Sequence, residues 1–375
     1  MGSPATAPTN AHPSAPRVAL WDNARFALIA LVVVGHTIST VRHDTALAYG
    51  IYTYIYLFHM PALIALSGYF SRASATTKTG RATLQLIVLW VLWEGIWVVI
   101  GFAAIDETPA QSFLVSPSWT LWYLVTIVTM RIVLPYMAQL RHPLLVSIAI
   151  ALFGGVIPVI GTEFSAARTL TFLPFFVAGW LARTNGWLDG EWFAAPRRWV
   201  RVWSWGILSV IAAVFIALPG LRSWWRLDGW LTWRDGYARR FSDAPIGDWS
   251  PHHWIETTLG GAAVTALLLL LAATMTFAVL AVTPRRRLVV TAWGARTLSV
   301  YLLHGPIVWA LRQTGVIDAV GELGELGVVI LIVGALVLAS LLALAPVERA
   351  FRWVLAPNLD RFFRDPSPGS DRSAR

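Results

Sequence analysis

The sequence predicts an all-α fold, a polytopic membrane bundle of about ten transmembrane helices with both termini inside the cell (N-in and C-in). Of its 375 residues, 57% are hydrophobic and only 13% are charged, whereas soluble domains carry about 25% charged residues. Apolar segments close to the ~20 residues that a helix needs to cross a bilayer recur along the chain. Basic residues gather in alternate connections between them, which indicates an orientation in the membrane.

The expected spans divide the chain into a membrane domain, residues 17–348, and two tails. Residues 1–16 are polar and rich in Pro and Ala, which predicts a disordered tail. Residues 349–375 are predicted to form a basic cytoplasmic tail, and 219–254 an extracytoplasmic loop rich in Trp. The span over 168–183 is the weakest, because it is short and contains Pro174. The spans are expected near residues 20–40, 51–70, 83–105, 119–138, 143–160, 168–183, 201–218, 256–282, 293–311 and 325–346.

The distribution of Lys and Arg sets the predicted orientation. With the N-terminus inside, the inner segments hold nineteen of these residues and the outer segments eight, five of them in the loop 219–254. This bias predicts an even number of spans in a bacterial inner (plasma) membrane. It also accounts for the net charge of +9 without a nucleic-acid partner. The absence of Cys excludes a thiol nucleophile and thiolate metal sites, and no metal site is predicted.

Six ionisable residues are predicted to lie deep within the spans, where burial is costly and usually reflects function. With a rise of about 1.5 Å per residue, the arginines fall on the inner side of the membrane and His36 on the outer side. Several of these residues also have a purely structural interpretation. His59 or His304 could be a helix-packing residue, and Glu94 could be the partner that neutralises Arg131. The six are His36, His59, His304, Glu94, Arg25 and Arg131.

The first span places three polar residues on one helix face. Arg25 and His36 are eleven positions apart, which at ~100° per residue leaves them about 20° from the same face. Asp22 is three positions before Arg25, a spacing that allows a salt bridge, and is expected to orient Arg25. A purely structural or scaffold role for the protein would not explain why these polar residues share one face.

Four segments resemble the acyltransferase 3 family of integral membrane O-acyltransferases. WDNARFALIALVVVGH (21–36) is similar to its opening span, and is nearest the fucose 4-O-acetylase-like branch. The family motif is a basic residue and a histidine with ten residues between them, here Arg25 and His36. YIYLFHMPALIALSGYF (54–70), SWTLWYL (118–124) and RTLSVYLLHGPI (296–307) resemble later family patterns, in the same order along the chain.

The resemblance implies transfer of an acyl group, usually acetyl from acetyl-CoA, to a hydroxyl of an extracytoplasmic or lipid-linked carbohydrate. It implies His36 as the catalytic residue and Arg25 as its essential companion. Acetyl-CoA would be a co-substrate and no cofactor would be bound permanently; the other partners would be a carbohydrate or glycolipid acceptor and the lipid bilayer. Some relatives carry a soluble hydrolase-like domain at the C-terminus, which is not expected after residue 346.

The remaining roles follow from the chemistry that such a transfer needs. His36 is expected to act as general base or as a transient acyl carrier. Glu94, His59 and His304 are candidates to orient its ring, with Glu94 first because a carboxylate also stabilises an imidazolium. Arg25 and Arg131 are expected to bind CoA phosphates. Ser67, Trp122 and Tyr301 are further candidates to line the substrate cavity.

Two alternatives remain open at the level of sequence. A proton-coupled transporter or exporter would use buried His, Glu and Arg as a relay, although the chain lacks convincing inverted repeats. An acyltransferase with a larger donor, such as succinyl-CoA, fits the same residues. The Trp-rich loop either forms an interfacial aromatic belt or stacks on sugar rings. Its tryptophans are Trp224, Trp225, Trp230, Trp233, Trp249 and Trp254. The acceptor and the oligomeric state are not predicted.

Overall fold

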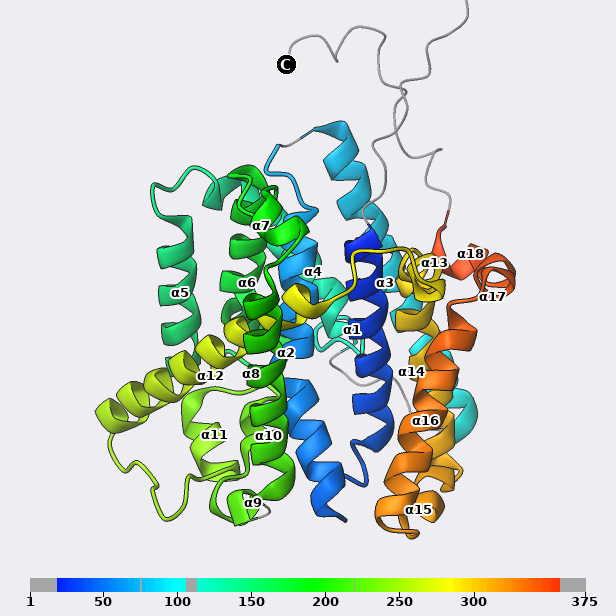
Figure 1. Ribbon diagram of the computed structural model, residues 1–375. Coiled ribbons are helices and arrows are strands. Elements are labelled where there is room, and N and C mark those ends of the chain that lie inside the picture. The colour runs from blue at the N-terminus through cyan, green and yellow to red at the C-terminus, as the bar shows by residue number, and fades with distance from the viewer. Residues whose placement is uncertain (1–18, 75, 106–112, 219, 358–375) are drawn as a thin grey trace, which may run out of the picture.

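The computed structural model describes residues 19–74, 76–105, 113–218 and 220–357, and every regular element in them is a helix (Figure 1). The predicted tail over 1–16 and the part of the predicted basic tail after 357 lie outside these residues. The tail's first residues belong to two short helices, α17 (Ala345–Ala350) and α18 (Arg352–Leu355). The latter packs on α3, where the Trp93 indole Nε1 donates to the Val354 carbonyl at 3.0 Å.

Each of the ten expected spans coincides with a helix, so the prediction of a polytopic helical membrane bundle is confirmed. Among the described residues, seven helices are long and apolar enough to cross a membrane: α1, α2, α3, α6, α8, α12 and α16. The span predicted as weakest, α6, is one of them and stays continuous through Pro174. The shorter helices are α4, α5 and α14, of 16, 11 and 17 residues. The bounds are α1 (Ala19–Ile38), α2 (Ala46–Tyr69), α3 (Thr77–Ile105), α4 (Trp122–Met137), α5 (Pro143–Phe153), α6 (Ala166–Thr184), α8 (Arg198–Ala217), α12 (Trp254–Val282), α14 (Thr297–Gln313) and α16 (Glu325–Leu342).

The connecting helices gather at the two ends of the bundle. α7 (Glu191–Ala194), α13 (Val289–Gly294) and α17 lie at the end where α1 begins, at the top of Figure 1. α9 (Gly220–Trp224), α10 (Leu227–Trp230), α11 (Tyr237–Asp243) and α15 (Val316–Gly321) lie toward the opposite end. Two 3₁₀ turns, η1 (Gly154–Val156) and η2 (Glu163–Ser165), precede α6. We call these the inner and outer ends, after the predicted orientation.

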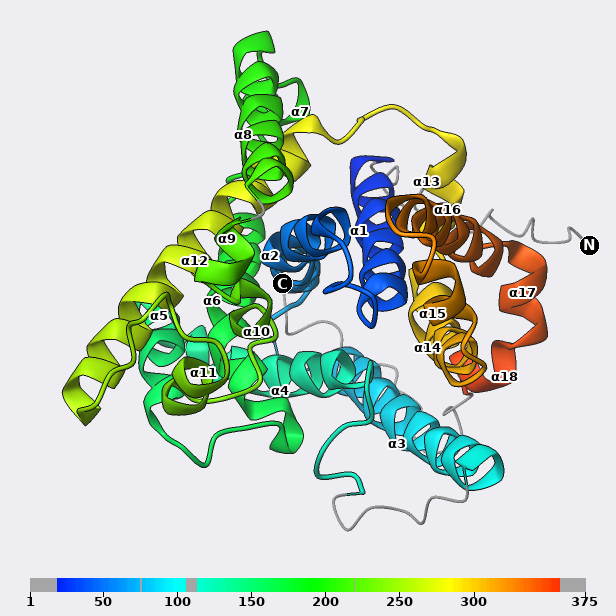
Figure 2. The same cartoon turned by 90° about the horizontal axis from the view of Figure 1, so that it is seen from below.

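Helix α1 occupies the centre of the bundle, and this placement positions the site. It packs against α2 on one side and α14 and α16 on the other, with α3 and α4 across the third side (Figure 2). Most of α1 is therefore buried in protein, whereas α8 exposes large apolar side chains such as Trp203 and Trp205. That pattern is expected where the outer helices face lipid and the polar residues face the protein interior.

Two glycines bring α2 and α6 into close contact. A Cβ at Gly68 would lie 1.9 Å from the Phe176 carbonyl oxygen, and one at Gly179 would lie 1.9 Å from the Ala65 carbonyl oxygen. Small residues at such crossings let the backbones of membrane helices approach. Gly68 belongs to the SGY element of the second span, so this part of the motif supports helix packing beside the cavity.

Candidate active site

His36 lies in the last turn of α1, at the outer end of the helix, and is partly exposed to a cavity. The edge of its ring meets Trp119, with ring centroids 5.0 Å apart and planes at 83°. The ring of His304, from α14, lies 5.4 Å away on the same measure. The His36 carbonyl accepts a hydrogen bond from Arg312 Nη2, which also donates to Ser39 Oγ at 2.6 Å. Two segments far from α1 in sequence, the one that carries Trp119 and helix α14, thus enclose the imidazole.

An inner cavity of about 290 Å³ extends from His36 toward the inner end of the bundle. Its walls come from α1, through Ile29 and Val32, and from α2, α4 and α14. Ser67 and Tyr123 share a hydrogen bond of 2.8 Å in its wall. Five residues singled out in the sequence line this one cavity, namely His36, Ser67, Trp122, Arg131 and Tyr301.

Arg131 joins the inner cavity to a wider cleft at the inner end. This inner cleft, of about 690 Å³, is lined by Arg72, Lys78 and several hydroxyl side chains. The Nε of Arg131 is buried and has no hydrogen-bond acceptor within the residues that the structure describes. No ion pair joins Arg131 to Glu94 in that part of the chain, so the structure does not support mutual neutralisation of the two. A guanidinium whose Nε is buried without an acceptor at such a junction suits an anionic ligand.

An outer cavity of about 390 Å³ opens on the other side of His36. It shares His36, Met60 and Trp122 with the inner cavity. Its other lining residues include His59, Trp119, Arg42, Arg168, Arg234 and Trp233. The imidazole of His36 therefore borders both cavities, at the point where they meet.

Glu94 anchors the segment that carries Trp119. Its carboxylate is 1% exposed and accepts hydrogen bonds from Ser118 N at 2.8 Å, Ser118 Oγ at 2.6 Å and Trp90 Nε1 at 3.0 Å. Tyr301 donates to the Thr120 carbonyl at 2.5 Å. Trp119, between these anchors, has a φ of +28°, a strained value for a residue with a side chain. Glu94 thus acts on His36 only indirectly, by holding the segment that carries Trp119. The structure does not place the Glu94 carboxylate on the imidazole.

His59 and His304 use their rings in the same way. Each Nδ1 contacts the carbonyl four residues earlier, Ile55 at 2.7 Å and Val300 at 2.9 Å. A carbonyl only accepts, so Nδ1 carries the hydrogen and, in the neutral ring, Nε2 carries the lone pair. His304 Nε2 is buried and has no partner in the described part of the chain, while His59 lines the outer cavity.

Arg25 and Asp22 form the predicted pair at the inner end of α1. Arg25 Nη1 lies 3.4 Å from Asp22 Oδ1, and the guanidinium lies 4.1 Å from the centroid of the Phe70 ring. The cavity-lining residues of α1 begin at Ile29, one turn beyond Arg25, and continue through Val32 to His36. The expected common face is thus present, with Arg25 below the cavity.

The Trp-rich loop folds over the outer cavity, and its tryptophans have different environments. Trp224, Trp249 and Trp254 are between 42% and 75% exposed. Trp230 and Trp233 are buried, and of the six tryptophans Trp233 is the one among the residues that line the outer cavity. Its indole nitrogen is buried without a partner among the described residues, and its φ is +54°.

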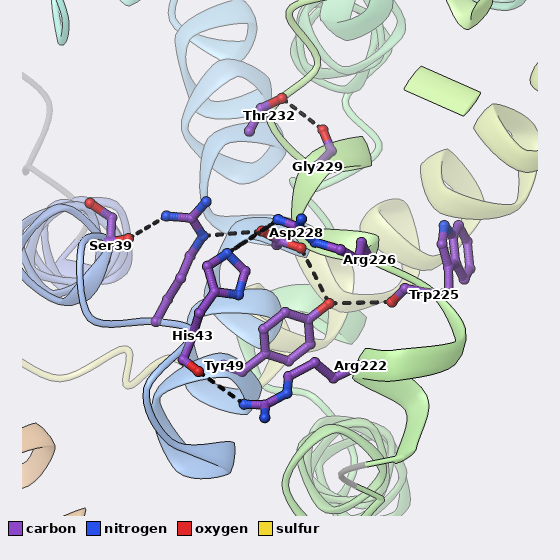
Figure 3. A network of polar contacts seen from close by, with 10 residues as sticks. Ser39, His43, Tyr49, Arg222, Trp225, Arg226, Asp228, Gly229 and Thr232 are labelled. Carbon is purple, nitrogen blue, oxygen red and sulfur yellow. Dashed lines mark hydrogen bonds and ion pairs between the residues drawn. The ribbon is translucent and has the colours of Figure 1, made fainter. Parts of the chain in front are cut away.

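Asp228 fastens this loop to the connection between α1 and α2 (Figure 3). Its side chain is 2% exposed and lies 3.1 Å from Arg42 Nε, 3.2 Å from His43 Nε2 and 3.7 Å from Arg226 Nη2. Tyr49 from α2 adds a contact of 3.4 Å to the other carboxylate oxygen. The buried carboxylate thus holds one side of the outer cavity in place.

Sequence reasoning missed Arg312, Arg168 and Trp119. The two arginines fall at the outer ends of expected spans, where positive charge indicates orientation more often than a site. Arg168 lies 4.5 Å from the Trp122 ring centroid, and its Nε donates to the Thr232 carbonyl at 3.0 Å. Trp119 lies within the SWTLWYL segment, which is the one signal that would have found it.

Comparison with known proteins agrees with this layout. Residues 18–345 match the acyltransferase domain family known as acyltransferase 3. Nodulation protein NolL of Mesorhizobium japonicum is 26% identical over 219 residues, which are 53% of this chain and 55% of that protein. The chain thus matches about half the length of this curated relative, and no solved structure matches it. Because the family match covers nearly the whole membrane domain, the chain belongs to the acyltransferase 3 family of membrane acyltransferases.

Proposed function

We propose that the protein is a membrane-embedded O-acyltransferase that moves an acetyl group from cytoplasmic acetyl-CoA to a hydroxyl of an extracytoplasmic or lipid-linked carbohydrate. The observation that carries the proposal is the position of His36, where the inner and outer cavities meet. A donor entering from one side and an acceptor from the other would meet at this imidazole.

The inner cleft supports the donor side of the proposal. Arg72, Lys78 and Arg131 supply positive charge, and Ser and Thr hydroxyls supply donors for phosphate oxygens. The adenine nucleotide part of CoA would occupy the cleft. Its pantetheine arm would extend past Arg131 into the inner cavity, whose apolar wall is interrupted by Ser67 and Tyr123. Arg25, paired with Asp22, would add charge at the inner end.

His36 would act as the general base. The acceptor hydroxyl oxygen attacks the thioester carbonyl carbon, the C–O bond forms and the C–S bond breaks. His36 takes the hydroxyl proton and returns it to the leaving thiolate, giving the ester and CoA thiol. In the second route the imidazole carries the acetyl group between two such displacements. Glu94 and Tyr301 would position His36 by holding the Trp119 segment.

The test is consumption of labelled acetyl-CoA by the purified full-length protein in lipid nanodiscs with a glycan acceptor fraction. We expect His36→Ala to lower the rate by at least about 10²-fold, with unchanged expression and thermal stability. His142→Ala, at an exposed histidine far along the chain, is the matched control and should retain activity. Full thioester consumption by His36→Ala would overturn the proposed mechanism.

A second variant tests the donor site. Arg131→Gln should raise the KM for acetyl-CoA about tenfold through loss of one charge-assisted contact, with a smaller effect on kcat. Arg141→Gln removes an exposed arginine after the same helix and should change neither constant. A transporter would consume no thioester at all, and a larger preferred donor would appear as turnover of succinyl-CoA above acetyl-CoA.

A further inference from the structure

The outer cavity has an excess of positive charge close to the acyl-transfer position. Arg42, Arg168 and Arg234 line it, and Arg312 adjoins it through the His36 carbonyl and Ser39. Behind the wall, the Arg240 guanidinium lies 5.3 Å from the Trp233 ring centroid. Burial lowers the pKa of Arg240 to about 10, so it remains a cation at neutral pH.

The neighbouring carboxylates are already engaged elsewhere. Asp228 faces Arg42, His43 and Arg226, so that one carboxylate serves two arginines. Asp235 lies 3.6 Å from Arg239, an exposed arginine of the same loop. Within the described residues, no carboxylate lies at ion-pair distance from Arg168 or Arg234. The cavity therefore keeps two lining arginines that form no ion pair in the described part of the chain.

Arg168 is the best placed of these to contact a ligand. An Arg side chain has five N–H donors, and the one hydrogen bond that Arg168 makes in the described part of the chain uses Nε, to the Thr232 carbonyl. The Arg168 guanidinium packs over the Trp122 ring, with its central carbon 4.5 Å from the ring centroid. Trp122 also borders the inner cavity. Four N–H groups are thus left for a ligand in the cavity that contains His36.

We infer that the acceptor carries an anionic group, a phosphate or a carboxylate, which binds at Arg168 and Arg234 while the reacting hydroxyl lies at His36. A neutral acceptor that displaced water from this cavity would leave its arginines desolvated without a counter-charge, which is costly. An anion supplies the missing negative charge and accepts hydrogen bonds from the free N–H groups in a bidentate manner. This inference rests on the proposed function, because it assigns the outer cavity to the acceptor.

The test compares three probes built on the same hexose ring: glucose 1-phosphate, glucuronic acid and methyl glucoside. Binding is measured by calorimetry on the full-length protein in nanodiscs, with CoA present to occupy the inner cleft. We expect at least one anionic probe to bind about tenfold or more tightly than methyl glucoside. A preference for glucose 1-phosphate alone assigns a phosphate, a preference for glucuronic acid alone assigns a carboxylate, and both together assign a general anion site.

Variants locate the preference. Arg168→Gln and Arg234→Gln should each remove most of it, and Arg168→Lys should keep part of it because the charge remains. Arg234 is exposed, so its variant should fold normally even if Arg168→Gln does not. Arg222→Gln is the control, because the one hydrogen bond of this half-buried arginine in the described part of the chain goes to the His43 carbonyl. Equal binding of the three probes, or a preference lost in Arg131→Gln and kept in both Arg168→Gln and Arg234→Gln, would overturn the inference.

Thioester consumption is measured on the same preparations, so that the two proposals fail separately. Turnover that depends on His36, together with equal binding of all probes, would reject the anionic acceptor and leave the acyltransferase function in place. A charge preference at Arg168 without any His36-dependent turnover would support an anion site and contradict the proposed reaction.

Discussion

His304 of α14 lies 5.4 Å from His36 of α1, ring centroid to ring centroid, and its Nδ1 is occupied by the Val300 carbonyl. The lone pair of a neutral His304 is therefore on Nε2, which is buried and unpartnered among the described residues. An acceptor in this position can hold one ring N–H of His36, which leaves the other ring nitrogen to take a proton from the acceptor hydroxyl. His304 is thus a better candidate than Glu94 for orienting the imidazole.

Replacing the His304 acceptor should lower kcat and leave donor binding intact. We expect His304→Phe, which retains a ring of similar size, to reduce kcat by about tenfold to a hundredfold, because misplacing a catalytic group by about 1 Å costs on that order. The KM for acetyl-CoA should stay within about twofold. His304→Gln keeps a side-chain acceptor and should recover part of the rate. Steady-state kinetics check this prediction. A purely structural role of His304 would instead lower thermal stability and impair both kcat and the KM for acetyl-CoA.

The sequence predicted the parts of the site that depend on helical phase and motif order. The spacing of Arg25 and His36 placed them on one face of α1. The later segments brought Ser67, Trp122 and Tyr301 to the same cavity as His36. Arg131, which was predicted to lie deep within its span, lines that cavity too. These relations depend on the periodicity of a single helix or on the order of motifs along the chain.

The partners of Glu94 and Arg312 depend on how separate helices rotate against each other. Depth in the membrane places Glu94 at a level that would suit either His36 or Arg131, but only the azimuth of α3 directs its carboxylate to Ser118. Arg312 falls at the end of an expected span, where positive charge normally indicates membrane orientation. Its contacts with His36 and Trp119 exist because α14 packs against α1.

Glu94 should contribute to stability and to the rate through the segment 118–120. Glu94→Ala removes the acceptor of three hydrogen bonds and leaves buried donors unsatisfied, each worth about 1–3 kcal/mol, so we expect a clear loss of thermal stability. Glu94→Gln keeps an acceptor for Ser118 and should be milder. Among molecules that remain folded, Glu94→Ala should lower kcat because Trp119 is no longer held at His36. Thermal unfolding and turnover are measured together, and an Ala variant with wild-type values of both would contradict this role.

Trp233 and Trp254 should behave differently, although both belong to the same loop. Trp233 is 1% exposed and lines the outer cavity, whereas Trp254 is 75% exposed at the start of α12. Trp233→Phe keeps an aromatic side chain, with a smaller ring, but removes the unpartnered indole N–H, so we expect weaker acceptor binding with little change in the KM for acetyl-CoA. Trp254→Phe should leave both unchanged. The reverse pattern would indicate that the exposed tryptophans, and not the cavity wall, bind the acceptor.

The attachment of the Trp-rich loop at Asp228 should weaken as the pH falls. Burial, and then the charge of Arg42, lower the pKa of His43 below its usual value near 6.5, and they outweigh the opposing effect of Asp228. Between the lowered pKa and about 6.5, the unfolded segment therefore binds more protons than the folded one. Local stability decreases as the pH is lowered through this window, and it levels off below the lowered pKa. A protonated His43 would be a third cation beside Arg42 and Arg226 around one carboxylate.

Hydrogen exchange of residues 39–45 and 220–232 at pH 7.5 and pH 5 measures this effect when the rates are expressed as protection factors, which divide out the slower intrinsic exchange of amides at lower pH. We expect smaller protection factors at the lower pH in the wild-type protein and a smaller difference in His43→Gln, whose side chain does not titrate. The effect should be modest, because the His43 side chain is 38% exposed and solvent screens its charge. His252→Gln, at an exposed histidine of the same loop, should respond to pH like the wild type. Larger protection factors at pH 5 in the wild type would show that Asp228 dominates the charge of His43, and that acid strengthens the attachment of the loop.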